Sequence, residues 1–343
     1  MATMTMATGS DDVVEDAKTM RAAIQEGMGS ADVLTIKEVP LPEVPDDRVL
    51  LKVRGSSVNA ADYHTIRGGR VVSLIGMLMR MPDAPPIRGG DVSGIVAAVG
   101  KDVTALHPGD EVFGTARGSW AQYATATERT LVAKPAALSF LAAGTVGVAA
   151  VTALQGLRDK GRLAAGQRVL IYGAGGGVGT YAVQIAKALG AHVTAVTGPA
   201  SFELVRPLGA DVLVDYTKED VAKRGERYDV IFDVAAIRSI GSLRRMLVPG
   251  GILVLAGAAK KGGSIGLFAR LIAGMFRGRV LKQRVIFYVA SIRSEDLAFL
   301  KGLLESGAIH PVIDRTYPLS DIREAVRYTI DGHGRAKVAI AVD

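Results

Sequence analysis

The 343-residue sequence contains no cysteine. Disulfide bonds, thiolate metal ligands and a cysteine nucleophile are therefore excluded. Aromatic residues are scarce, at 5%, although hydrophobic residues make up 49% of the chain and glycine occurs 41 times. This balance is typical of a globular α/β protein rich in Ala, Val, Leu and Gly. The length predicts two domains rather than one.

Long apolar runs are also missing. No stretch reaches the roughly 18 apolar residues of a membrane span, and the N-terminus lacks the basic start and apolar run of a secretory signal. We therefore expect a cytoplasmic protein without an integral membrane segment. The net charge of +7 comes from Lys and Arg scattered among 34 acidic residues, so no nucleic-acid partner is expected.

The first part of the chain has the pattern of β-structure. Residues 1–19 are polar, acidic and small without a sustained period, and they predict a disordered leader, either native or added. After them, short apolar runs closed by Gly, Pro or Asp predict strands in a compact, barrel-like unit. These runs are 20–25, 33–42, 48–59, 91–100, 109–114 and 120–125.

From about Gly147 the pattern changes to strands and helices in alternation. Strand-like runs at 168–172, 192–197, 212–216, 228–235 and 251–257 are separated by segments suited to helices. Such βαβ alternation predicts a doubly wound parallel sheet. We expect this domain to span 147–289, and the tail 290–343 to complete the first domain of 20–146.

A glycine cluster follows the run at 168–172 and opens an amphipathic helix. Strand, turn and helix stand in the order that the dinucleotide-binding fingerprint requires. A cofactor diphosphate must approach bare backbone N–H groups at a helix N-terminus, where a β-carbon would block it. Against the six-residue spacing Ala174 takes the first glycine position. The expected contacts are Ala174, Gly176, Gly177, Val178 and Gly179.

The next loop bears on which dinucleotide is bound. An NAD-preferring protein places Asp or Glu about twenty residues beyond the glycines to hold the ribose hydroxyls. Here the loop runs from Thr197 to Ser201 and contains no carboxylate. NADPH is therefore favoured over NADH, although no Lys or Arg stands in the loop to pair with the 2′-phosphate.

Several further motifs complete a specific pattern from residue 20 to residue 343: SSVNAADYHTIRG (56–68), RGGDVSG (88–94), GDEVFG (109–114), LGADVLVDYTKED (208–220) and VIDRTYPLSDIREAVRY (312–328). With these motifs the chain resembles the zinc-free, quinone oxidoreductase-like branch of the medium-chain dehydrogenase/reductase superfamily. The resemblance implies a GroES-like β-rich catalytic domain beside a Rossmann domain.

The resemblance also implies that no metal is needed. Zinc-dependent relatives use Cys near the position of Asn59 and a His-Glu pair where this chain has Gly90 and Asp91. The five histidines are too dispersed to form a catalytic zinc site.

Cofactor contacts follow by position. The resemblance places Thr152 at the nicotinamide amide, Tyr216 at the 2′-phosphate side, with Ser201 replacing a basic residue, Gly257 and Phe287 at the nicotinamide end, and Lys337 on the phosphate side. Each of them also has a purely structural interpretation as core or turn.

The expected chemistry is hydride transfer with stabilisation of a developing oxyanion. Asn59, Tyr63 and His64 lie in the motif at the mouth of the cleft in this family and are the candidate hydrogen-bond donors. The first hypothesis is an NADPH-dependent enone or quinone reductase. A ketone or aldehyde reductase and a cofactor-binding scaffold without turnover remain as alternatives.

Two interaction features are expected as well. The family often forms homodimers through the Rossmann sheet edge. Residues 266–279 carry two adjacent apolar ridges at helical spacing and three arginines, and they suit a substrate lid, a dimer contact or a membrane-surface helix. The lid is favoured because the segment directly follows the strand at the nicotinamide end.

Overall fold

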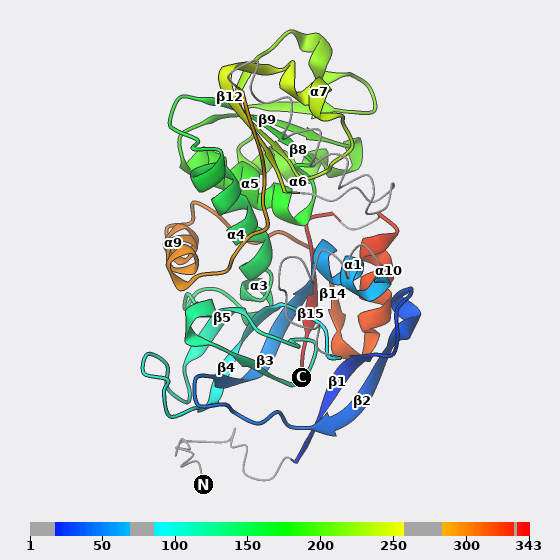
Figure 1. The fold of residues 1–343 in the computed structure, drawn as a ribbon, viewed down its shortest axis with the longest axis vertical. Coiled ribbons are helices and arrows are strands. Elements are labelled where there is room, and N and C mark those ends of the chain that lie inside the picture. Colours follow the sequence, from blue (N-terminus) through cyan, green and yellow to red (C-terminus); the bar gives the residue numbers. More distant parts are fainter. Residues whose placement is uncertain (1–17, 69–85, 257–282, 333–334) are drawn as a thin grey trace. The chain divides into compact units, whose positions relative to one another are not determined.

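The computed structural model describes residues 18–68, 86–256, 283–332 and 335–343 (Figure 1). They divide into two compact units. The first comprises the described residues up to Val148, with Ile292–Glu305 and Pro311–Asp343; the second comprises Ala149–Ser291 and Ser306–His310, without the undescribed part. Gly257 and the 266–279 segment lie outside the described residues.

The first unit is built on β-structure. Strands β1 and β2 form an antiparallel pair, and a second sheet has the order β14-β15-β3-β4-β5-β7, with β6 paired to β3. The strands are β1 (Thr19–Gln25), β2 (Leu34–Pro40), β3 (Val49–Val58), β4 (Asp91–Val99), β5 (Glu111–Thr115), β6 (Tyr123–Ala126), β7 (Leu131–Ala133), β14 (Ile313–Pro318) and β15 (Lys337–Ala341). Its helices are α1 (Ala60–Arg67), α3 (Phe140–Ala143), α9 (Ser294–Glu305) and α10 (Ile322–Ile330).

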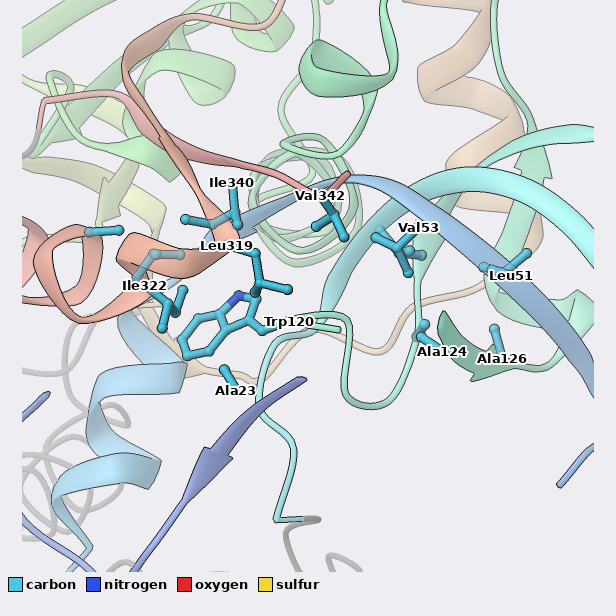
Figure 2. Packing of buried hydrophobic residues seen from close by; sticks show 14 of the residues in the cluster. Ala23, Leu51, Val53, Trp120, Ala124, Ala126, Leu319, Ile322, Ile340 and Val342 are labelled. Atoms are coloured by element: carbon cyan, nitrogen blue, oxygen red, sulfur yellow. The ribbon is translucent and has the colours of Figure 1, made fainter. Parts of the chain in front are cut away.

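The core of this unit gathers around the single tryptophan. Trp120 is fully buried, and Figure 2 shows its indole among Ala23, Leu319 and Ile322, which come from two segments far apart in the sequence. The indole N–H donates to the carbonyl oxygen of Ser57 at 3.2 Å. The core thus fixes the end of β3, the strand that leads into α1.

The second unit holds a six-stranded parallel sheet in the order β10-β9-β8-β11-β12-β13. Its strands are β8 (Arg168–Tyr172), β9 (His192–Thr197), β10 (Val212–Asp215), β11 (Tyr228–Asp233), β12 (Leu247–Leu255) and β13 (Arg284–Phe287). Its helices are α5 (Gly177–Ala188), α6 (Phe202–Val205) and α7 (Ile240–Arg244), and α4 (Gly147–Leu154) leads into it. The predicted doubly wound sheet is confirmed.

One predicted helix is absent from the second unit. Between β10 and β11 the sequence pattern favoured a helix, but the described chain forms a single 3-10 turn, Val221–Arg224. Asp220 caps this turn and Gly225 ends it in the left-handed conformation, at φ 73°. Only four residues therefore separate the start signal from the stop signal, too few for a stable α-helix.

The order of the strands creates a switch point between β8 and β11. From β8 the chain proceeds outward to β9 and β10, and from β11 it proceeds in the opposite direction to β12 and β13. Loops that follow the carboxyl ends of β8 and β11 therefore diverge. In open α/β sheets ligands bind in the crevice at such a point.

Candidate active site

The glycine turn lies at this switch point. Gly173 follows β8 with φ 90°, and a β-carbon built on it would stand 3.1 Å from Val234 and Ala235, which follow β11. Helix α5 then begins with Gly176 as its N-cap. Its first helical hydrogen bond runs from Thr180 N to Gly176 O, at 2.9 Å. The three N–H groups before Thr180 precede the intrahelical bonds, which makes this end suited to an anion.

The glycines of the turn are required for different reasons. A β-carbon on Gly179 would lie 2.1 Å from the carbonyl oxygen of Gly173, so this glycine lets the helix pack on the turn. A β-carbon on Gly175 would lie 2.5 Å from Thr197 Oγ1. By contrast, a β-carbon on Gly176 would come no closer than 3.5 Å to Gly173 O. The protein itself has room at Gly176, and this room is where a diphosphate could approach the backbone.

The structure brings Tyr216 to the loop after β9. Its backbone N–H donates to Thr197 O at 3.3 Å, and a β-carbon on Gly198 would lie 3.4 Å from its ring. The Tyr216 side chain is 52% exposed, whereas Thr197 and Ser201 are buried. The aromatic ring thus offers an open surface beside the loop that the sequence assigned to the 2′-phosphate.

Sequence reasoning missed a carboxylate beside this loop. Asp215 ends β10 and pairs in register with Thr197 on β9. Its Oδ1 accepts hydrogen bonds from Thr217 N at 2.9 Å and Thr217 Oγ1 at 2.6 Å, and the hydroxyl bond holds the pKa of Asp215 below its usual range. Asp215 Oδ2 is buried without a hydrogen-bond partner, 4.0 Å from Lys218 Nζ. The strand pairing could have suggested this neighbour, but the linear spacing from the glycines could not.

Of the three residues expected at the nicotinamide end, Thr152 and Phe287 lie in the described part of the chain. Thr152 lies on α4, and its carbonyl oxygen accepts a hydrogen bond from the Tyr288 hydroxyl. Phe287 ends β13, is half-buried and pairs with Leu255 of β12. Burial raises the pKa of Tyr288, so its hydroxyl stays protonated at neutral pH. Tyr288 was not predicted, and its role here is to hold α4.

Tyr63 and His64 are neighbours on α1 in the first unit. Their ring centroids are 5.4 Å apart, and both side chains are partly buried. Arg67, one turn later, donates from Nη1 to the Tyr63 oxygen at 2.8 Å. The phenol therefore acts as acceptor toward Arg67 and keeps its own proton for another acceptor. Burial and the charge of Arg67 lower the pKa of His64, which keeps the imidazole neutral at pH 7.

The start of α1 carries a titratable carboxyl. Asp62 Oδ2 accepts the backbone N–H of Asn59 at 2.8 Å, one half of a capping box. Burial raises the pKa of Asp62 to about 7. The hydrogen bond from Asn59 lowers this pKa, and the negative charge of Asp91 raises it further. This carboxyl was not among the predicted site residues.

Asn59 belongs to a buried polar cluster with Lys337 and Asp91. Lys337 Nζ donates to Asn59 Oδ1 at 2.6 Å and to Asp91 Oδ2 at 3.0 Å. Asn59 Nδ2 donates to the same Asp91 oxygen at 2.9 Å. The exposed fractions are 2% for Lys337, 0% for Asp91 and 9% for Asn59. The ammonium is committed within this cluster and buried, so Lys337 does not present it to the cofactor phosphates as the sequence had suggested.

Metal ligands do not converge in the described ranges. Among residues 18–68, 86–256, 283–332 and 335–343, no group of three or more His, Asp or Glu side chains is arranged to hold a metal ion. Within the same residues no helix has the length and apolar character needed to cross a membrane.

Comparisons with known proteins agree with this arrangement. Residues 45–136 match the family of alcohol dehydrogenase GroES-like domains, and residues 208–340 match a family described as zinc-binding dehydrogenase. The chain is 31% identical over 340 residues to a 2-methylene-furan-3-one reductase of Solanum lycopersicum, covering 94% of this chain and 79% of that protein. It is 31% identical over 339 residues to an NADPH-dependent alkenal/one oxidoreductase, chloroplastic, of Arabidopsis thaliana, covering 94% and 80%.

A solved structure supports the same assignment. The quinone oxidoreductase from Coxiella burnetii superposes with a TM-score of 0.82 and 28% identity, covering 95% of this chain and all of that one. Two matched domains, relatives aligned over 94% of this chain and the glycine turn at the sheet's switch point lead to one conclusion. The chain is an NAD(P)H-dependent oxidoreductase of the medium-chain dehydrogenase/reductase superfamily, in its quinone oxidoreductase-like branch.

Proposed function

We propose that this protein is an NADPH-dependent, zinc-free reductase of an α,β-unsaturated carbonyl or quinone-like small molecule. The observation that carries the proposal is the glycine turn, in which Gly176 leaves room for a diphosphate at the N-terminus of α5. The names of the relatives, an alkenal/one oxidoreductase among them, agree with this substrate class. When bound, the dinucleotide supplies the hydride.

The preference for NADPH rests on the surroundings of residues 197–201. The loop itself holds no carboxylate, and Tyr216 offers an exposed ring beside it. Asp215 is a countervailing negative charge, but its carboxylate is buried and Lys218 stands 4.0 Å away with an exposed ammonium. Lys218 thus supplies the positive charge that the loop lacks, from the neighbouring turn.

At the substrate end the protein must stabilise negative charge on oxygen. Tyr63 is the preferred donor because Arg67 already donates to the phenol oxygen and leaves the phenolic proton available. The neutral imidazole of His64 is a second donor. Asn59 acts indirectly, because its amide is held by Lys337 and Asp91.

The decisive assay compares three acceptors under identical conditions. NADPH oxidation is measured with an enone, a matched saturated ketone and a quinone. Turnover of the enone or quinone but not the ketone supports the proposal. Preference for the ketone supports a carbonyl reductase, and NADPH binding without turnover of any acceptor supports a scaffold.

A glycine pair tests the cofactor site. Gly176→Ala should weaken NADPH binding by about tenfold or more, or roughly 1.4 kcal/mol, with the melting temperature unchanged. The matched control is Gly241→Ala on α7, where a β-carbon meets nothing within 4 Å, while on Gly176 it makes only an ordinary contact of 3.5 Å with Gly173 O. Equal NADPH affinities for both variants would contradict the assignment of the diphosphate to the turn.

The proposal includes two further expectations, one for the oligomeric state and one for the location in the cell. We expect a homodimer, to be measured by light scattering on the purified protein. We also expect a cytoplasmic location. The Arabidopsis relative carries the name chloroplastic, and cell fractionation would distinguish the two locations for this protein.

A further inference from the structure

Four segments of the first unit meet at one buried carboxylate. Asp91 Oδ2 accepts from Ser57 Oγ at 2.5 Å, in addition to Asn59 Nδ2 and Lys337 Nζ. Asp91 Oδ1 accepts the backbone N–H of Val148 at 2.6 Å. The end of β3, the start of β4, the start of β15 and the first turn of α4 are therefore joined through a single side chain.

Burial makes this arrangement costly unless every group is paired. Both charges lie out of water, and replacing such a pair by apolar residues of similar volume is often neutral or stabilising. Stability alone therefore does not account for a lysine and an aspartate here. Their hydrogen bonds are directional, however, and those to Asn59 and Val148 lie at the starts of α1 and α4, which carry candidate site residues.

The first such element is α1. Asn59 is its N-cap, and both ends of the Asn59 carboxamide are bound, the oxygen by Lys337 and the nitrogen by Asp91. Tyr63 lies one turn further along α1. The orientation of the N-cap therefore sets the rotation of the helix that presents the phenol.

The second element is α4. Asp91 Oδ1 holds the N–H of Val148, and a β-carbon on the preceding Gly147 would lie only 2.9 Å from that same oxygen. Thr152 follows one turn later on α4. The carboxylate thus fixes where this helix begins, at a place where the backbone approaches too closely for a side chain.

We propose that Lys337 and Asp91 form a positioning pair, which sets the starts of α1 and α4 and so orients Tyr63 on α1 and Thr152 on α4. The proposal rests on the proposed function for its kinetic consequence, but not for its structural one. Lys337 acts through Asn59, and Asp91 acts through both Asn59 and Val148.

The test uses a charge-neutral double variant, Asp91→Asn with Lys337→Met. Each single substitution leaves a buried charge unpaired and is expected to destabilise the protein strongly, whereas the double variant avoids that penalty. We expect the double variant to melt close to the wild type, to bind NADPH through its intact glycine turn, and to lose roughly ten- to a hundredfold in kcat with little change in KM. Amide hydrogen exchange should rise in residues 60–67 and 147–154.

Lys134→Met is the matched control. Lys134 is also a buried lysine of the first unit, but its ammonium pairs with the exposed Glu111 at 3.1 Å and donates to two carbonyl oxygens of its own loop. We expect wild-type kcat and unchanged exchange in α1 and α4 for this variant.

The outcomes separate the two proposals. Wild-type kcat together with wild-type exchange in the double variant would overturn the positioning pair. A different result is possible if the wild type turns over none of the three acceptors. Increased exchange in α1 and α4 of the double variant would then uphold the structural role of the pair, while the proposed function would be overturned.

Discussion

The raised pKa of Asp62 predicts an unusual dependence of stability on pH. The carboxyl titrates at about 7 in the folded protein and near its ordinary value of 3.8 in the unfolded chain. Between these values the folded state binds more protons than the unfolded state. The free energy of unfolding therefore falls as pH rises through this window, in contrast to a carboxylate that is stabilised by a salt bridge.

The size of the effect has a clear ceiling. A difference of about three pH units corresponds to about 4 kcal/mol at most, at 1.36 kcal/mol for each unit. Asp62 is only partly buried, so solvent relaxation reduces the effect, and we expect roughly 1–2 kcal/mol. For domains of this size class that amounts to a few degrees in the melting temperature.

The perturbation is Asp62→Asn. Asparagine keeps an oxygen to accept the Asn59 N–H but cannot ionise. We expect the variant to match the wild type only below about pH 3.8, to exceed it progressively above that value, and to melt a few degrees higher at pH 8, measured by thermal denaturation from about pH 3 to pH 8.

Asp32→Asn is a control with the opposite sign. Hydrogen bonds from Ser30 and Arg327 hold the pKa of Asp32 below its usual range, so neutralising it should lower the melting temperature at pH 8 and have less effect below pH 4. Parallel pH–stability curves for the wild type and Asp62→Asn would refute the burial argument.

Three further predictions concern catalysis and cofactor choice. Tyr63→Phe should lower kcat by about a hundredfold, equivalent to roughly 3 kcal/mol, without affecting NADPH affinity, whereas His64→Ala should mainly raise KM; wild-type rates in both variants would end the case for a side-chain donor. Dialysis against a strong chelator should leave activity unchanged, and a loss that zinc restores would contradict metal independence. Lys218→Ala should raise the Kd for NADPH about three- to tenfold and leave that for NADH unchanged, since only NADPH carries the 2′-phosphate; equal shifts for both would remove Lys218 from phosphate recognition.

Local signals in the sequence were sufficient to predict the sheet and the glycine turn between β8 and α5. The glycine turn depends on contiguous residues, so the strand before it and the helix after it could be placed from spacing alone. The close packing of Gly179 on Gly173 agrees with that prediction. The strand order follows from βαβ connections, which leave few alternatives.

The buried cluster could not be predicted in this way. Lys337 and Asn59 are 278 positions apart, and Lys337 and Asp91 are 246 apart. Their meeting depends on the pairing of β15 with β3 and of β3 with β4, which no local pattern specifies. A lysine near a chain end also suggests an exposed charge, and here tertiary packing overrides that tendency.

The donors on α1 are suited to the ene reduction that we propose. Hydride addition to a ketone leaves an alkoxide, a strong base that needs a committed proton donor, whereas addition to the β-carbon of an enone leaves a less basic enolate. The lowered pKa of His64 makes its imidazole neutral at pH 7, and the Asp62 oxygen nearest the backbone is engaged by Asn59. What remains is Tyr63, a neutral donor whose oxygen already receives a hydrogen bond from Arg67. Such a donor is sufficient to stabilise an enolate, which solvent can then protonate on carbon, whereas an alkoxide would have to take the phenolic proton itself and leave Tyr63 to be reprotonated.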